Sequence, residues 1–129
     1  MFSSDNLIFI PLGGSGEIGM NCNLYHYNGS WIMIDLGVMF GNSSMSPNEL
    51  IMPDISFLEE NKIKLNALIL THAHEDHIGA VPYLYHQLNN VPIYTSSFTA
   101  SVLKRKFMSN DVKNYDVRLL DYNNKISIG

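Results

Sequence analysis

The stretch LNALILTHAHEDHIGAV, at residues 65–81, combines a short apolar run with a dense group of histidines. Residues 65–70 are nearly all apolar and are followed by polar residues, which is typical of a strand covered on both faces. Residues 71–77, here called the histidine segment, follow directly. Residues 78–88 have the apolar spacing of a helix, with Pro82 near its start. The stretch therefore predicts a buried strand, then a loop held by rigid structure, then a helix.

The histidine segment carries four side chains of the kind that bind metal ions, His72, His74, Asp76 and His77. In extended backbone, side chains two residues apart share a face, so His72 and His74 are expected to reach one ion together. Asp76 and His77 lie past the turn and approach from another direction, where a second ion fits. Imidazole and carboxylate are suitable zinc ligands, and a site with few protein ligands keeps a position for water. The pattern therefore predicts a metal-dependent hydrolase.

The chain before this stretch is predicted to form an antiparallel sheet. Residues 7–12 and 22–27 have strand-like patterns on either side of a glycine-rich loop. Asn28-Gly29 between two apolar runs suits a type I′ turn, so residues 30–36 are expected to return antiparallel to the preceding strand. Residues 37–52 resemble a long loop, and residues 53–61 a short helix.

Strands and helices are predicted to alternate after the histidine segment. Residues 91–95 are typical of a strand and residues 97–108 of a helix. Residues 117–120 and 126–128 are expected to close the domain as a hairpin around Asn123-Asn124. Antiparallel strands first and alternation afterwards indicate an α/β fold with a sheet covered by helices.

A second motif in the sequence would indicate a dinucleotide-binding site rather than a metal site. The dinucleotide-binding fingerprint G-x-G-x-x-G is matched by Gly14-Ser15-Gly16-Glu17-Ile18-Gly19. Asp35 follows at about the sequence separation, ~20 residues, at which such proteins carry the acid that contacts the ribose. That fingerprint requires a crossover helix of about a dozen residues. Only residues 20–27 separate the last glycine from the Asn28-Gly29 turn, so the hairpin excludes a dinucleotide site. The glycines are expected to let a loop turn tightly near the metal site.

Composition indicates one globular domain, with 129 residues, 46% hydrophobic and 16% charged. No apolar run approaches the ~20 residues of a membrane-spanning helix, and residues 1–6 lack the basic residues of a secretory signal. We therefore expect a cytoplasmic protein without a membrane partner. The net charge of −4 gives no general attraction to nucleic acid, and Lys104-Arg105-Lys106 is expected to be a solvated helix face.

Three other reactive side chains are expected to be structural. Cys22 is the only cysteine, cannot form an internal disulfide, and is expected to pack in a strand rather than act as a nucleophile. His26 lies inside a predicted strand, and His86 lies on the predicted helix nine residues beyond His77. Neither histidine is expected to bind metal.

Four segments together resemble one known family: PLGGSGEIGMN at residues 11–21, IDLG at 34–37, PDISFLEEN at 53–61 and LTHAHEDHIGA at 70–80. They are similar to ribonuclease J, a member of the β-CASP branch of the metallo-β-lactamase-fold nucleases. The resemblance covers most of residues 7–100. The histidine motif alone identifies only the wider superfamily, and the flanking segments narrow it to this branch.

The resemblance implies a metallo-β-lactamase-type αββα sandwich and RNA processing and decay by 5′-to-3′ exonucleolytic and endonucleolytic cleavage. It also implies two zinc ions, with Mn²⁺ or another divalent ion as the alternative, and a homo-oligomer. His72 and His74 would bind one ion, and Asp76 and His77 the other. Asp35 would support the histidine segment without binding metal. Asp76 is further expected to orient, through its free oxygen, the hydroxide that attacks phosphorus.

The sequence departs from this family by lacking its later motifs. The family takes further ligands from those motifs, inserts a β-CASP domain that holds RNA, and adds a C-terminal domain. Residues 1–129 are therefore expected to be only the N-terminal part of a metallo-β-lactamase domain. No histidine follows His86, so each ion would keep two protein ligands instead of the usual three. Alone, the chain is expected to bind zinc weakly and not to cleave RNA, which would bind through the absent domains.

Two alternatives stay open. A hydrolase of the same fold that acts on a lactam, thioester or lactone would use the same hydroxide at a carbonyl carbon, and only the flanking resemblance argues against it. The second alternative is a non-catalytic metal-binding module in which an incomplete site supports the fold.

Overall fold

The computed structural model describes residues 5–41 and 49–129. Within them a central sheet has the strand order β1-β2-β3-β6-β7-β8. Its strands are β1 Ile8–Gly13, β2 Cys22–Tyr27, β3 Ser30–Ile34, β6 Ala67–Ile69, β7 Ile93–Thr95 and β8 Val117–Leu119. The helical segments are α1 Ser56–Glu60, α2 Glu75–Ile78, α3 Val81–Leu84, the 3₁₀ helix η1 Tyr85–Leu88 and α4 Ser97–Ser109. The expected α/β fold class is thus confirmed.

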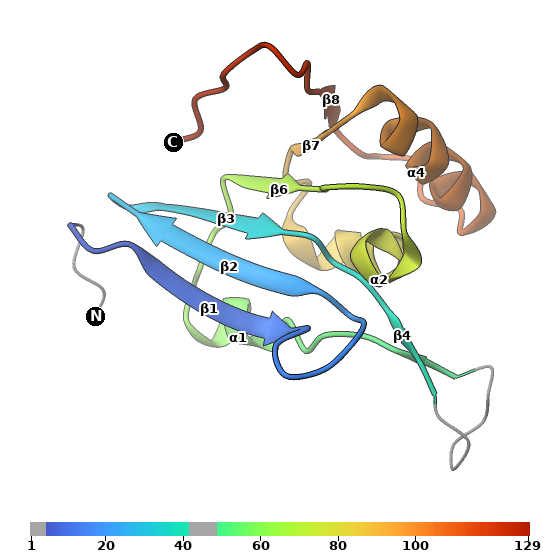
Figure 1. The fold of residues 1–129 in the computed structure, drawn as a ribbon, viewed down its shortest axis with the longest axis horizontal. Coiled ribbons are helices and arrows are strands. Elements are labelled where there is room, and N and C mark those ends of the chain that lie inside the picture. The colour runs from blue at the N-terminus through green and yellow to red at the C-terminus, as the bar shows by residue number, and fades with distance from the viewer. Residues whose placement is uncertain (1–4, 42–48) are drawn as a thin grey trace.

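The sheet has an antiparallel half and a parallel half (Figure 1). Strands β1, β2 and β3 pair antiparallel, and β3, β6, β7 and β8 pair parallel. Asn28 and Gly29 both have positive φ, 48° and 81°, as the predicted type I′ turn requires. The antiparallel hairpin confirms that the glycine-rich loop does not lead into a dinucleotide-binding crossover helix.

The core lies around β6 and the helices that follow it. Leu68 in β6 and Ile93 in β7 are fully buried, as expected for strands covered on both faces. Helix α4 contributes Leu103 and Phe107, and its N-cap is Ser96, whose Oγ accepts a hydrogen bond from the backbone N–H of Thr99 at 3.3 Å. No helix in the described part of the chain is long and apolar enough to cross a membrane.

The prediction of one continuous helix at residues 78–88 was wrong. Helix α2 ends at Ile78, and α3 and the 3₁₀ helix η1 follow as separate short segments. Tertiary contacts explain the break. The backbone N–H of Ala80 donates to Leu36 O at 3.0 Å, and Asp76 O, which a continuing helix would use, accepts from Asn21 instead. The last turn, η1, ends at Asn89 in the left-handed conformation, with φ 52°.

The predicted C-terminal hairpin was also wrong. Strand β8 pairs parallel with β7, and residues 126–128 form no strand. Two backbone bonds explain this, because Ile93 N donates to Asp116 O at 2.8 Å and Leu120 N to Thr95 O at 2.8 Å. The predicted loop at residues 37–52 contains two short paired strands, β4 Met39–Phe40 and β5 Leu50–Ile51. Its residues 42–48 lie outside the described residues.

Candidate metal centre

The histidine segment places three imidazoles side by side at the carboxyl end of β6 and the first turn of α2. The ring centroid of His72 lies 4.5 Å from that of His74 and 4.1 Å from that of His77. Parallel strands of an α/β sheet tend to present ligand sites at this edge. The structure therefore brings together the three histidines that the sequence singled out.

Asp76 stands next to His77, with Oδ2 3.6 Å from His77 Nε2. Two zinc bonds of about 2.1 Å at a tetrahedral angle have ends about 3.4 Å apart. The pair therefore has the spacing of two ligand atoms that share one ion. In the described residues, however, no three His, Cys, Asp or Glu side chains form a group that could hold one ion. The donor atoms are of the kinds that divalent ions bind, and the spacing of Asp76 and His77 suits two ligands of one ion.

Asp35 is the anchor of the cluster. Its carboxylate is buried, with 4% of the residue exposed, and Oδ2 accepts a hydrogen bond from His77 Nδ1 at 2.7 Å. A carboxylate acceptor requires the proton on Nδ1, which leaves the lone pair of neutral His77 on Nε2. Histidines that bind metal are oriented by a contact of this kind.

Backbone hydrogen bonds from residues 21–38 hold the histidine segment. Asn21 N donates to Asp76 O at 2.9 Å, Leu36 N to His77 O at 2.8 Å, and Val38 N to Glu75 O at 3.0 Å. Gly37 lies so close that a Cβ added there would overlap the backbone carbonyl of Asp76. The IDLG segment thus needs glycine because a side chain at residue 37 has no room, and no sequence pattern signals this contact.

Helix α4 is tied to the same place by an ion pair between Lys106 Nζ and Glu75 Oε1. Lys106 is thereby directed toward α2, whereas its neighbours Lys104 and Arg105 are exposed. The basic cluster is mainly a solvated face, as expected, with one member used to hold two helices together.

A hollow of about 750 Å³ adjoins the histidines. Its lining includes Thr71, His72 and His74, together with Phe98 from α4 and Tyr122 after β8. Phe98 is 72% exposed and Tyr122 99% exposed. Two exposed aromatic side chains therefore line the same hollow as two of the imidazoles.

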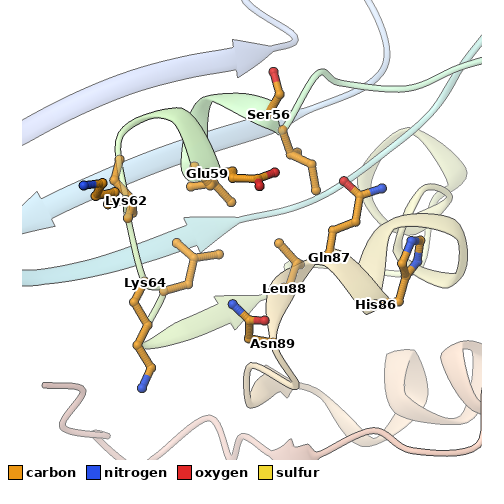
Figure 2. A pocket seen from close by; sticks show the side chains of 12 residues that line it. Ser56, Glu59, Lys62, Lys64, His86, Gln87, Leu88 and Asn89 are labelled. Atoms are coloured by element: carbon orange, nitrogen blue, oxygen red, sulfur yellow. The ribbon is translucent and has the colours of Figure 1, made fainter.

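A second hollow, of about 660 Å³, lies between α1 and η1 (Figure 2). Its polar lining includes Glu59, Lys62, Lys64, His86 and Gln87, and no residue of the histidine segment. His86 therefore lies apart from the other histidines. His26 also lies elsewhere, buried in β2 with its ring 4.6 Å from that of Trp31.

Cys22 is fully buried, which confirms that it packs in β2. Burial, and secondarily the negative charge of Asp35, raises the pKa of its thiol to about 12. The thiol is therefore protonated at neutral pH, the form that is a poor nucleophile.

The family model described as "Metallo-beta-lactamase superfamily" matches residues 16–124. The chain is 49% identical to ribonuclease J of Sinorhizobium meliloti over 110 residues, which cover 82% of this chain and 19% of that protein. It is 38% identical to ribonuclease J 2 of Staphylococcus saprophyticus over 120 residues, covering 93% and 21%. The chain thus spans about a fifth of the length of these curated relatives.

Among solved structures, the short form of human tRNase Z has a similar fold, with a TM-score of 0.54 and 16% sequence identity. The match covers 86% of this chain and 42% of that one. At this identity the likeness concerns the fold alone.

Proposed function

The chain belongs to the metallo-beta-lactamase superfamily, and on that premise we propose that it supplies metal ligands to a ribonuclease of the ribonuclease J type. The observation that supports this most is the cluster of His72, His74 and His77, with Asp35 fixing the last of them. The similarity to ribonucleases J narrows the proposal from hydrolases in general to nucleases.

His72 and His74 would hold one divalent ion, and Asp76 and His77 a second. Two zinc ions, with Mn²⁺ or another divalent ion as the alternative, would supply Lewis-acid chemistry and hydroxide at neutral pH. The side chains of this chain have their own tasks in cleavage of the phosphodiester. Asp76 would use its second oxygen to orient the attacking oxygen toward phosphorus, and Asp35 would keep His77 in its ligand tautomer.

The hollow beside the histidines would receive the RNA next to the scissile bond. Exposed aromatic side chains stack on bases without regard to sequence, and the presence of Phe98 and Tyr122 in the lining of this hollow supports such a role. The net charge of −4 provides little attraction for phosphates. We therefore propose that a longer protein, cytoplasmic and homo-oligomeric, adds the remaining ligands and the basic surface that holds RNA.

The test uses the full-length natural protein that carries this chain, supplied with zinc or manganese. We expect cleavage of 5′-monophosphorylated RNA and none of a chromogenic lactam. Asp76→Ala should lower the cleavage rate by a larger factor than it lowers RNA affinity, because Asp76 acts on the reacting atoms. The matched control is His86→Gln, in the other hollow, which should change neither. Lactam hydrolysis without RNA cleavage, or equal losses of rate and affinity in Asp76→Ala, would overturn the proposal.

A further inference from the structure

Thr71 connects buried Asp35 to His72 through one hydroxyl group. Thr71 Oγ1 lies 2.9 Å from Asp35 Oδ2 and 2.9 Å from His72 Nδ1. The backbone N–H of Thr71 also donates to Asp35 Oδ1, at 2.8 Å, which fixes the main chain at this position. The hydroxyl therefore stands between the carboxylate and the imidazole, in contact with both.

The number of protons decides the direction of these bonds. An ionised carboxylate can only accept, so the single proton of the hydroxyl goes to Asp35. The oxygen of Thr71 then has only lone pairs to offer His72, and Nδ1 of His72 must be the donor. Neutral His72 is left with its lone pair on Nε2, the same tautomer that Asp35 imposes directly on His77.

We propose that Thr71 is a positioning residue that relays Asp35 to His72 and so sets the tautomer and orientation of both His72 and His77 from one carboxylate. This inference rests on the proposed metal centre, in which His72 and His77 serve different ions. Since both rings are held from Asp35, directly or through Thr71, their relative placement is fixed by one buried group. Threonine suits this task better than serine, because its branched Cβ restricts χ1 and keeps the hydroxyl in place.

The alternative role for Thr71 is purely structural, with the hydroxyl only satisfying the buried carboxylate. The two roles differ in what happens to His72 when the hydroxyl is removed. Loss of a structural bond would lower the free energy of unfolding and leave the tautomer of His72 unchanged. Loss of the relay would free Nδ1, and His72 would move toward the Nε2–H form that neutral imidazole favours in water.

The test measures imidazole ¹⁵N shifts by NMR in the metal-free, full 129-residue chain labelled at histidine, at about pH 8, above the pKa of free imidazole. In the unsubstituted chain and in Thr71→Ser, we expect His72 to carry its proton on Nδ1. In Thr71→Val, which keeps the shape and removes the hydroxyl, His72 should shift toward Nε2–H while His77 stays unchanged. The control is Thr95→Val, since Thr95 Oγ1 donates to Leu70 O at 3.0 Å, away from the rings.

Zinc affinity, measured by competition with a chelator, is the second readout. Thr71→Val should weaken binding about tenfold or more, as loss of a supporting contact to a ligand does, and Thr71→Ser should retain most of the affinity. An unchanged His72 tautomer in Thr71→Val, or an equal shift in Thr95→Val, would overturn the inference. The tautomer is read without metal or RNA, so it stands or falls separately from the ribonuclease proposal, which Asp76→Ala tests.

Discussion

The hollow beside the histidine segment and the hollow between α1 and η1 differ in how their polar groups are held. At the histidine segment, hydrogen bonds join residues far apart in sequence, such as Asn21 with Asp76 and Asp35 with His77. At the hollow between α1 and η1, the bonds between lining residues are local, as in Lys62 N, which donates to Glu59 O at 3.0 Å. The volumes of the two hollows are similar. Long-range hydrogen bonds that fix donors and acceptors, rather than concavity, therefore distinguish the candidate site.

The largest effect is expected from Gly37→Ala, because the new Cβ would overlap the backbone carbonyl of Asp76. The backbone at Gly37 and the backbone at Asp76 cannot move apart without breaking the hydrogen bonds that hold the histidine segment. We expect the free energy of unfolding to fall by about 3 kcal/mol, measured by urea denaturation. Gly16→Ala is the control, since Gly16 has open space and only a positive φ of 75°, and should cost about 1 kcal/mol. Equal losses would show that the contact with Asp76 is not the cause.

Asp35→Asn should have the next largest effect. Both oxygens of Asp35 receive donors, so either orientation of an amide would point N–H groups at N–H or O–H groups. We expect a loss of about 2 kcal/mol in unfolding free energy and a 10–100-fold fall in zinc affinity. Asp54→Asn, at an exposed carboxylate that accepts from Ser56 N at 3.0 Å, is the matched control. Unchanged zinc affinity in Asp35→Asn would show that Asp35 does not support metal binding.

Lys106→Met removes the ion pair between α4 and α2. Both partners are partly exposed, so solvent screens the pair and the loss should be about 0.5 kcal/mol in thermal or urea unfolding. Lys104→Met on the same helix should cost less, since Lys104 is exposed. If both substitutions have the same effect, the ion pair does not help to hold the histidine segment.

The smallest effect is expected from His86→Gln in the second hollow. His86 is exposed, so the free energy of unfolding should change by less than about 0.5 kcal/mol. Zinc affinity should stay the same in the chelator competition. A clear loss of zinc binding would break the distinction between the two hollows.

Features encoded by neighbouring residues were predictable from sequence. The Asn28-Gly29 turn, the buried strand before the histidines and helix α4 were all confirmed, because each depends on local backbone preference and periodicity. The clustering of His72, His74 and His77 also followed from their spacing. Whether they bind metal stays a prediction.

Features that depend on distant segments were not predictable. The helix after His77 breaks because Leu36 O and Asn21 take part in its hydrogen bonding, and no periodicity within residues 78–88 reveals this. Likewise, β8 joins the free edge of β7, whereas the local pattern around Asn123-Asn124 suggested a hairpin. The position of the Thr71 hydroxyl between Asp35 and His72 could be seen only in the structure, although Thr71 precedes His72 directly in the sequence.

The order of the segments along the chain has a consequence for biosynthesis. Residues 21–38, which hold the histidine segment and include the hairpin of β2 and β3, leave the ribosome before it does. An isolated two-stranded hairpin is only marginally stable in water, so these residues gain their full stability when the later strands and the histidine segment pack against them. Completion of the sheet and assembly of the histidine cluster are thus one event, which follows the emergence of the histidine segment.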